Sequence, residues 1–120
     1  MMMCKYSEAF KLQVVRELGP GLLESTYEPC LAHELSRAEI PFKLQSKLPV
    51  RYKGQLLNCG YRVDLLVDDK IIVELKSVDR LTAVHEAQLL TYMKLADVGI
   101  GLLINFNVVL LRDGLNRFVL

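Results

Sequence analysis

The sequence has no tryptophan, only two histidines and only three cysteines in 120 residues. Cys4, Cys30 and Cys59 lie far apart, and neither a CxxC pair nor a Cys/His cluster is present, which argues against a structural zinc site and against an iron–sulfur cluster. Few and widely spaced cysteines are typical of reduced thiols, so we expect an intracellular, cytoplasmic protein. With so few histidines, no Ser–His–Asp or Cys–His catalytic arrangement can be argued either.

Long apolar runs are also missing. The longest, from about Val98 to Leu111, is broken by Asn105 and Asn107 and is too short to span a bilayer. The opening residues, MMMCKYSEAF, lack the continuous apolar segment of a signal peptide. We therefore expect a soluble protein with no membrane partner.

Neither sign of charge is in excess. Fifteen Lys and Arg stand against fourteen Asp and Glu, which gives a formal net charge of +1. This balance excludes a strongly cationic protein that coats nucleic acid non-specifically, but it allows a local basic surface. Hydrophobic residues make up 52% of the chain and charged residues 24%, so we expect a single folded domain over residues 1–120.

The period of the hydrophobic pattern changes along the chain. Helical spacing predicts helices at about 6–18, 22–38 and 82–96. Period-two alternation predicts strands at 42–53, 60–67 and 70–77, followed by two or three more in the last third. Gly19-Pro20-Gly21 separates the first two helices, and Asp113-Gly114 predicts a turn between late strands. This order predicts an α/β (α+β) domain with a mixed central sheet flanked by helices.

The strand at 70–77 contains the segment IIVELKS, in which Glu74 and Lys76 share one face because side chains alternate along a strand. Asp64 lies in the preceding strand, which is equally apolar. Since neighbouring strands lie about 4.8 Å apart, the carboxylates of Asp64 and Glu74 can converge on one point. Two converging carboxylates repel each other unless a cation or a proton lies between them, and oxygen ligands suit Mg²⁺ or Mn²⁺. The alternative is a solvated strand face with a Glu–Lys pair.

A second set of polar residues lies on the helix predicted at 82–96. Leu81, His85, Gln88, Tyr92 and Leu95 form one stripe with apolar ends and a hydrogen-bonding middle. Facing a cleft, the middle residues could hold phosphate, substrate or water, whereas facing the core they would form a structural network. We favour a functional role for Gln88 and Tyr92, and His85 fits either role.

A third acid is found in the segment GLLESTYE, where Glu24, Tyr27 and Glu28 share one helical face. Glu24 is a candidate metal ligand, and the alternative is that an acid near a helix start simply favours the positive end of the helix dipole. Tyr27 is more typical of a packing residue than of a reacting one. We expect Glu28 to be solvated.

Residues 41–62 contain five Lys or Arg and no acid. Four of these, predicted on one face of a single strand, are candidate nucleic-acid contacts: Lys43, Lys47, Arg51 and Lys53. An edge strand that lysines protect from aggregation explains the same pattern equally well.

These features resemble the GxxExxY family, whose naming motif is met by Gly21, Glu24 and Tyr27. Similar segments extend over nearly the whole chain: LGPGLLESTYE, LPVRYKG, YRVDLLVDDKIIVELK, VHEAQLLTYMKL and GLLINFNV. That family is grouped with PD-(D/E)xK nuclease-like proteins, so the resemblance implies a restriction-endonuclease-like fold with an αβββαβ core. The segment from Gln88 to Tyr92 resembles the QxxxY motif of RecB-like exonucleases, although the cysteines that hold an iron–sulfur cluster in some of them are absent here.

The resemblance implies a Mg²⁺- or Mn²⁺-dependent nuclease that acts on DNA or RNA. Its metal ligands would be Asp64, Glu74, Glu24 and the backbone carbonyl of Leu75. Lys76 would position or activate the attacking water, while Gln88 and Tyr92 would orient the substrate. Two alternatives remain: a non-catalytic module that binds nucleic acid or protein on the same scaffold, and a subunit active only in a larger complex. A homodimer is compatible with this size, but nothing in the sequence identifies its contact face.

Overall fold

The structure, a computed structural model, describes residues 2–107 and 115–120, with side chains described from residue 9 onward. The helices are α1 (Met2–Leu18), α2 (Glu24–Arg37) and α3 (Ala83–Ala96). The strands are β1 (Phe42–Lys47), β2 (Val50–Tyr52), β3 (Gln55–Leu57), β4 (Arg62–Val67), β5 (Ile71–Lys76), β6 (Ile100–Asn105) and β7 (Leu115–Val119). None of the helices among these residues is long and apolar enough to cross a membrane.

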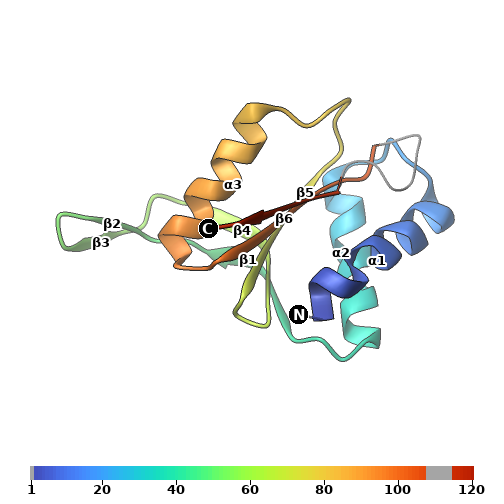
Figure 1. The fold of residues 1–120 in the computed structure, drawn as a ribbon, viewed down its shortest axis with the longest axis horizontal. Coiled ribbons are helices and arrows are strands. Elements are labelled where there is room, and N and C mark those ends of the chain that lie inside the picture. Colours follow the sequence, from blue (N-terminus) through green and yellow to red (C-terminus); the bar gives the residue numbers. More distant parts are fainter. Residues whose placement is uncertain (1, 108–114) are drawn as a thin grey trace.

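Five of the strands form one mixed sheet in the order β1-β4-β5-β6-β7 (Figure 1). β5 and β6 are parallel, because α3 carries the chain back between them, and every other neighbouring pair is antiparallel. Without the β2–β3 hairpin and β7, the order from α2 onward is helix, three strands, helix, strand. The predicted αβββαβ core and the mixed sheet flanked by helices are therefore confirmed.

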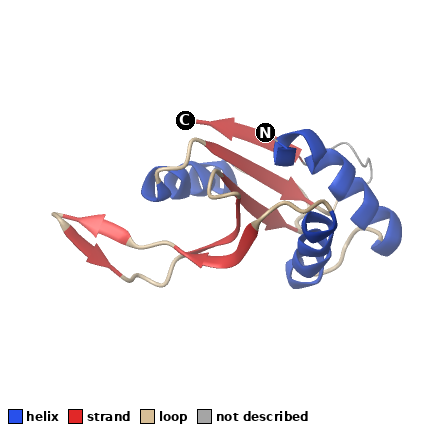
Figure 2. Cartoon of the chain, turned by 90° about the horizontal axis from the view of Figure 1, so that it is seen from below, coloured by secondary structure: helices blue, strands red, loops and turns tan. Residues whose placement is uncertain are grey.

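Helices cover both faces of this sheet. α1 and α2 lie against one face and α3 against the other (Figure 2). The central strand β5 alternates between two hydrophobic clusters: Val73 and Leu75 pack with Tyr27 and Leu31 of α2, whereas Ile72 packs with residues of α3. Its nearly continuous apolar sequence reflects burial on both faces. A charged residue in β5 is therefore held in the interior unless it lies at the end of the strand.

The prediction of one strand over 42–53 is wrong. β1 ends at Lys47, and Pro49 follows, which has no backbone N–H to donate to a sheet. β2 instead pairs with β3 in a separate two-stranded sheet. The turn between them has φ of 50° at Lys53 and 80° at Gly54, and two positive φ values in succession suit a tight hairpin. The alternation pattern misses β3 because three residues are too few to show a period.

The other predicted elements agree with the structure within a few residues at each end. The first helix is longer than predicted, because it begins at Met2 instead of near residue 6. The last third contains β6 and β7, and the predicted turn at Asp113-Gly114 lies outside the described residues.

Candidate active site

β4 and β5 separate at the end of the sheet where β4 begins and β5 ends. They pair from Val67 opposite Ile71 to Leu65 opposite Val73. Beyond this point, side chains replace the backbone ladder. The N–H of Leu75 donates to Asp64 Oδ2 at 2.8 Å, and the N–H of Asp64 donates to Glu74 Oε1 at 3.3 Å. The structure thus brings the carboxyl groups of Asp64 and Glu74 together, each fixed by the backbone of the other strand.

The electrostatics of this pair depend on burial. Glu74 is only 7% exposed. Burial above all, together with the charge and side-chain hydrogen bond of Asp64, raises the pKa of Glu74 from 4.5 to about 8, although a backbone hydrogen bond at Asp64 and the positive charge of Lys76 oppose the shift. At neutral pH Glu74 therefore retains a proton, which its hydrogen bond shares with Asp64. An all-oxygen pair that must share a proton is chemically suited to share a divalent cation instead.

Asp64 also lines a pocket of about 170 Å³ between α2 and the sheet, together with Glu24, Ser25, Glu28, Gln45 and Leu75. The Nε2 group of Gln45 donates to Glu28 Oε1 at 2.8 Å and to Asp64 Oδ1 at 3.3 Å. Gln45 thereby links the acid on β4 to the acid on α2. Sequence reasoning missed this role, and it predicted Glu28 to be solvated whereas Glu28 is half-buried. A lone glutamine in an edge strand carries no signal of such a contact.

Glu24 begins α2 and lines the same pocket as Asp64, but its side chain is exposed. Its Oε1 accepts a hydrogen bond from the N–H of Ser77 at 3.3 Å. Across the described part of the chain, no three His, Cys, Asp or Glu side chains are grouped closely enough to hold a metal ion. The structure therefore brings together Asp64 and Glu74, and it places Glu24 at the rim of the site instead of beside them.

Tyr27 fixes the start of α2. Its side chain is fully buried, and its ring stacks on Phe106 with centroids 4.5 Å apart and planes 9° apart. The phenol donates to the carbonyl of Gly19 at 2.6 Å and accepts the N–H of Leu22 at 3.0 Å. These bonds hold the loop before α2, in which Gly19 and Gly21 have positive φ. Tyr27 thus has a structural position that sets where Glu24 lies.

Asn105, at the end of β6, holds the segment that follows β5. It is 1% exposed, and its Oδ1 accepts the N–H groups of Val78 and Asn107, both at 3.1 Å, while its Nδ2 donates to the carbonyl of Val78 at 2.9 Å. Ser77 in turn donates its hydroxyl to the carbonyl of Leu22. The segment after Lys76 is thereby fastened to β6 and to the loop before α2. Sequence reasoning missed this role, although an asparagine inside the apolar run LLINF was a usable signal.

α3 contributes a hydrogen-bonded pair. Gln88 Nε2 donates to the hydroxyl of Tyr92 at 2.9 Å, and Tyr92 is 8% exposed. Burial raises the pKa of Tyr92 above its ordinary value of 10.0, the hydrogen bond from Gln88 opposes the rise, and the carboxyl groups of Glu74 and Asp64 add to it. The phenol of Tyr92 therefore lies within electrostatic reach of the carboxyl pair and stays protonated.

The remaining members of the predicted stripe have other surroundings. His85 Nδ1 accepts the N–H of Thr82 at 3.1 Å, so this histidine caps the start of α3. Lys76 is half-buried, and its charge acts on Glu74. Within the described residues the ion pairs are Lys43–Asp69 and Lys70–Asp68, so Lys76 takes part in none.

Comparison with known proteins agrees with this geometry. A family model described as the PD-(D/E)XK nuclease superfamily matches residues 3–118. The chain belongs to the PD-(D/E)XK nuclease superfamily. This membership supports a nuclease-like function, and nucleases of the superfamily generally use divalent metals such as Mg²⁺. No curated protein and no solved structure gives a significant match, so the narrower resemblance to GxxExxY proteins stays a prediction.

The basic residues of this PD-(D/E)XK protein do not share the single face predicted for them. Lys43 lies near the turn between β4 and β5, where its Nζ is 3.0 Å from Asp69 Oδ1. Lys47 ends β1 opposite Arg62, at the end of the sheet that carries the carboxyl pair. Arg51 and Lys53 belong to the β2–β3 hairpin. Two sheets separated by Pro49 cannot present one continuous face, and β1 is an edge strand.

Proposed function

We propose that this chain is a Mg²⁺- or Mn²⁺-dependent nuclease that hydrolyses phosphodiester bonds of DNA or RNA, with residues 1–120 acting as one domain. The observation that carries the proposal is the pair of carboxyl groups at Asp64 and Glu74, each of which accepts a backbone N–H from the other of two diverging strands. Superfamily membership gives this pair a nuclease context. Lys76 lies two residues after Glu74 on the same strand, as the D…E-x-K motif requires.

The oxygen atoms of Asp64 and Glu74, with the backbone carbonyl of Leu75, would hold the cation, and Glu24 would support it from the rim. When bound, the cation would act as a Lewis acid on the phosphate and replace the shared proton as the positive charge between the acids. The reciprocal backbone bonds keep both carboxyl groups in place before the cation arrives. The side-chain amide of Gln45 also donates a hydrogen bond to Asp64 Oδ1 and so helps to hold that carboxyl group.

The remaining groups would act on water and substrate. Lys76 would orient or deprotonate the attacking water and stabilise negative charge on the phosphate. Tyr92 accepts its hydrogen bond from Gln88, so the hydrogen of its own hydroxyl can be donated to a phosphate oxygen. Because the pKa of Tyr92 is raised above its ordinary value, the hydroxyl keeps that hydrogen near neutral pH.

The test combines metal binding with cleavage. Isothermal titration with Mn²⁺ should show binding that Asp64→Ala and Glu74→Ala abolish, and Lys76→Ala should bind Mn²⁺ but lose cleavage of labelled single-stranded, double-stranded, branched and RNA substrates. Asp69→Asn is the matched control, because Asp69 is an exposed acid at the far turn between β4 and β5. Titrations unchanged in both alanine variants would refute the metal site. Bound metal without cleavage of any substrate would favour a non-catalytic module or a subunit that needs a partner.

A further inference from the structure

Positive charge is concentrated in one part of the chain. Residues 41–62 carry five Lys or Arg and no acid, whereas the whole chain has a net charge of +1, so the remaining residues together carry −4. Asp64 comes two residues after the end of this basic segment, so the segment leads directly to the carboxyl site along the chain. A polyanion that approached the acidic site would therefore be attracted first by the basic segment.

The outer half of this segment stands away from the rest of the molecule. We call residues 50–62 the arm; they comprise β2, β3 and the return of the chain as far as Arg62, the first residue of β4. The β2–β3 hairpin projects beyond the sheet on the side of α3 (Figures 1 and 2), and every residue from 51 to 62 is exposed. An isolated two-stranded hairpin is only marginally stable in water. The exposed side chains of this hairpin are available to contact a partner.

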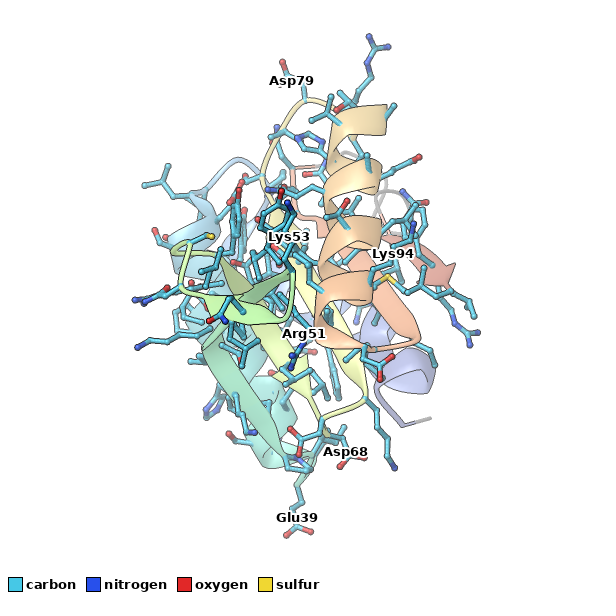
Figure 3. All side chains as sticks on the ribbon, turned by 90° about the vertical axis from the view of Figure 1, so that its left-hand side faces the viewer. Glu39, Arg51, Lys53, Asp68, Asp79 and Lys94 are labelled. Atoms are coloured by element: carbon cyan, nitrogen blue, oxygen red, sulfur yellow. The ribbon has the colours of Figure 1, made fainter. Side chains whose placement is uncertain are left out.

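The side chains of the arm identify the partner's chemistry. Tyrosines alternate with basic residues in Arg51-Tyr52-Lys53 and Tyr61-Arg62, and Tyr52 and Tyr61 are 60% and 46% exposed. Figure 3, which views the molecule from the side of the hairpin, shows Arg51 and Lys53 at the end that faces the reader. Proteins that bind single strands combine exposed aromatic rings, which stack on bases, with basic groups that neutralise phosphates.

The base of the arm contacts the candidate active site. The N–H of Leu48 donates to the carbonyl of Tyr61 at 2.9 Å, which fixes the return of the arm to the sheet. The ring of Tyr61 then lies 6.0 Å from that of Tyr92, with the planes tilted by 50°. The carboxyl groups of Glu74 and Asp64 act electrostatically on Tyr92 of α3 and help to raise its pKa. A strand bound along the arm would therefore arrive next to those carboxyl groups.

Other occupants fit the arm less well. A symmetric contact between the arms of two copies would bring Arg51, Lys53 and Arg62 of both together, without an acid in either arm to pair with them. A double helix would offer phosphates to the basic groups, but its bases are stacked on each other and cannot receive the two tyrosine rings. Unpaired bases can, and the exposed Leu56 and Leu57 provide further apolar contact for them.

We propose that the arm binds single-stranded nucleic acid, with Tyr52 and Tyr61 stacking on unpaired bases and Arg51, Lys53 and Arg62 contacting phosphates, and that it leads the strand to Asp64 and Glu74. Only the delivery of the strand to Asp64 and Glu74 rests on the proposed nuclease function. Binding by the arm requires neither metal nor cleavage, so it can be measured by itself.

The experiment is fluorescence anisotropy of the full chain in EDTA with a labelled single-stranded DNA, an RNA of the same sequence and the matching DNA duplex. Tyr52→Leu, which keeps an apolar side chain without a ring, should weaken single-strand binding about fivefold or more, whereas Tyr52→Phe should bind like the wild type. Lys53→Gln should lower the affinity and reduce the slope of log affinity against log salt by about 0.7. Lys70→Gln removes the same charge at the distant β4–β5 turn and should change neither.

Three results of the anisotropy experiment would overturn the inference: Tyr52→Leu binding as tightly as the wild type, preferential binding of the duplex, or no binding of any oligonucleotide. Self-association in sedimentation that Tyr52→Leu abolishes would also overturn it, in favour of a second copy on the arm. Cleavage is assayed separately with Mg²⁺. If the protein binds single strands through the arm but cleaves nothing, the binding role of the arm is supported and the nuclease function is refuted. If the protein cleaves and substitutions in the arm change neither binding nor cleavage, the nuclease function is supported and the role of the arm is refuted.

Discussion

Asp64 and Glu74 are joined across two strands by a reciprocal pair of hydrogen bonds. The carboxyl group of Asp64 on β4 accepts the N–H of Leu75, and the carboxyl group of Glu74 on β5 accepts the N–H of Asp64. Each acid therefore satisfies a backbone donor that the separating strands would otherwise leave unpaired. The same bonds hold two acidic groups in contact, so the local requirement of the fold and the requirement of a cation site are met by the same atoms.

The first prediction concerns stability in the absence of metal. The pKa of Glu74 is about 8 in the folded chain against its ordinary value of 4.5, so between these pH values the folded state holds a proton that the unfolded state releases. Stability from this group is fully present below about pH 4.5 and is lost as the pH rises towards 8. Urea denaturation in EDTA should show this decline. Glu74→Gln, which cannot ionise, should flatten it, and Asp69→Asn should not.

The second prediction follows for metal binding. A cation between Asp64 and Glu74 must displace the shared proton, so Mn²⁺ should bind more weakly near pH 6 than near pH 8, with a proton released on binding. Calorimetric titration in two buffers of different ionisation enthalpy measures that proton directly. Equal affinity at both pH values, with no proton released, would mean that the cation binds away from this pair.

The third prediction concerns the loop that carries Glu24. Tyr27→Phe keeps the ring stacked on Phe106 but removes the hydroxyl that serves Gly19 and Leu22. Because the loop loses two part-buried hydrogen bonds, each worth about 0.5 to 1.5 kcal/mol, we expect a loss of about 1 to 3 kcal/mol in the free energy of unfolding. Tyr52→Phe removes an exposed hydroxyl from the hairpin and serves as the control, with no change expected. Equal stability of the two variants would show that the loop is held by other contacts.

The fold was predictable because its signals are local and periodic. The segment RVDLLV alternates between buried and less buried residues, whereas IIVELK is buried over nearly its whole length. The acid inside each segment stands out against its apolar neighbours. Proximity of Asp64 to Glu74 followed from strand spacing once the Asp68-Asp69 turn was taken to make the two strands neighbours. The prediction of one continuous β-strand over 42–53 failed because Pro49 and the Lys53-Gly54 turn interrupt the strand. The alternation of apolar and polar residues continues on both sides of Pro49 and hides the interruption.

Contacts between distant polar residues were less predictable. Gln45 meets Glu28 and Asp64 only because β1 lies beside β4 and under α2, a relationship that no local pattern contains. His85 fits a polar stripe, yet its Nδ1 serves the first turn of its own helix, since a side chain at that position reaches the N–H of Thr82. Helical spacing shows which side chains share a face, but not which of them the helix itself uses.

The fourth prediction tests how α3 is seated on the sheet. A Cβ at Gly101 in β6 would lie 2.6 Å from Met93 Sδ and 3.0 Å from Leu89 Cδ1, two side chains of α3 that are fully buried. Gly101→Ala should therefore lower the free energy of unfolding by about 1 to 3 kcal/mol through overpacking. A Cβ at Gly99 meets nothing within 4 Å, so Gly99→Ala is the matched control and should not destabilise the protein. Two equally stable variants would mean that α3 shifts freely on the sheet.

The fifth prediction separates a substrate-binding role of Tyr92 from a structural one. Tyr92→Phe retains the buried ring and its contact with Tyr61 but removes the hydroxyl that accepts a hydrogen bond from Gln88. If that hydroxyl donates to a phosphate oxygen during cleavage, its loss should lower the rate of turnover by about tenfold or more, while the lost hydrogen bond costs only about 1 kcal/mol of stability. Tyr61→Phe, which keeps its ring, is the control and should cleave at the wild-type rate. Single-turnover cleavage and urea denaturation measure the two effects independently, and an unchanged rate in Tyr92→Phe would assign the Gln88–Tyr92 pair to the stability of α3 alone.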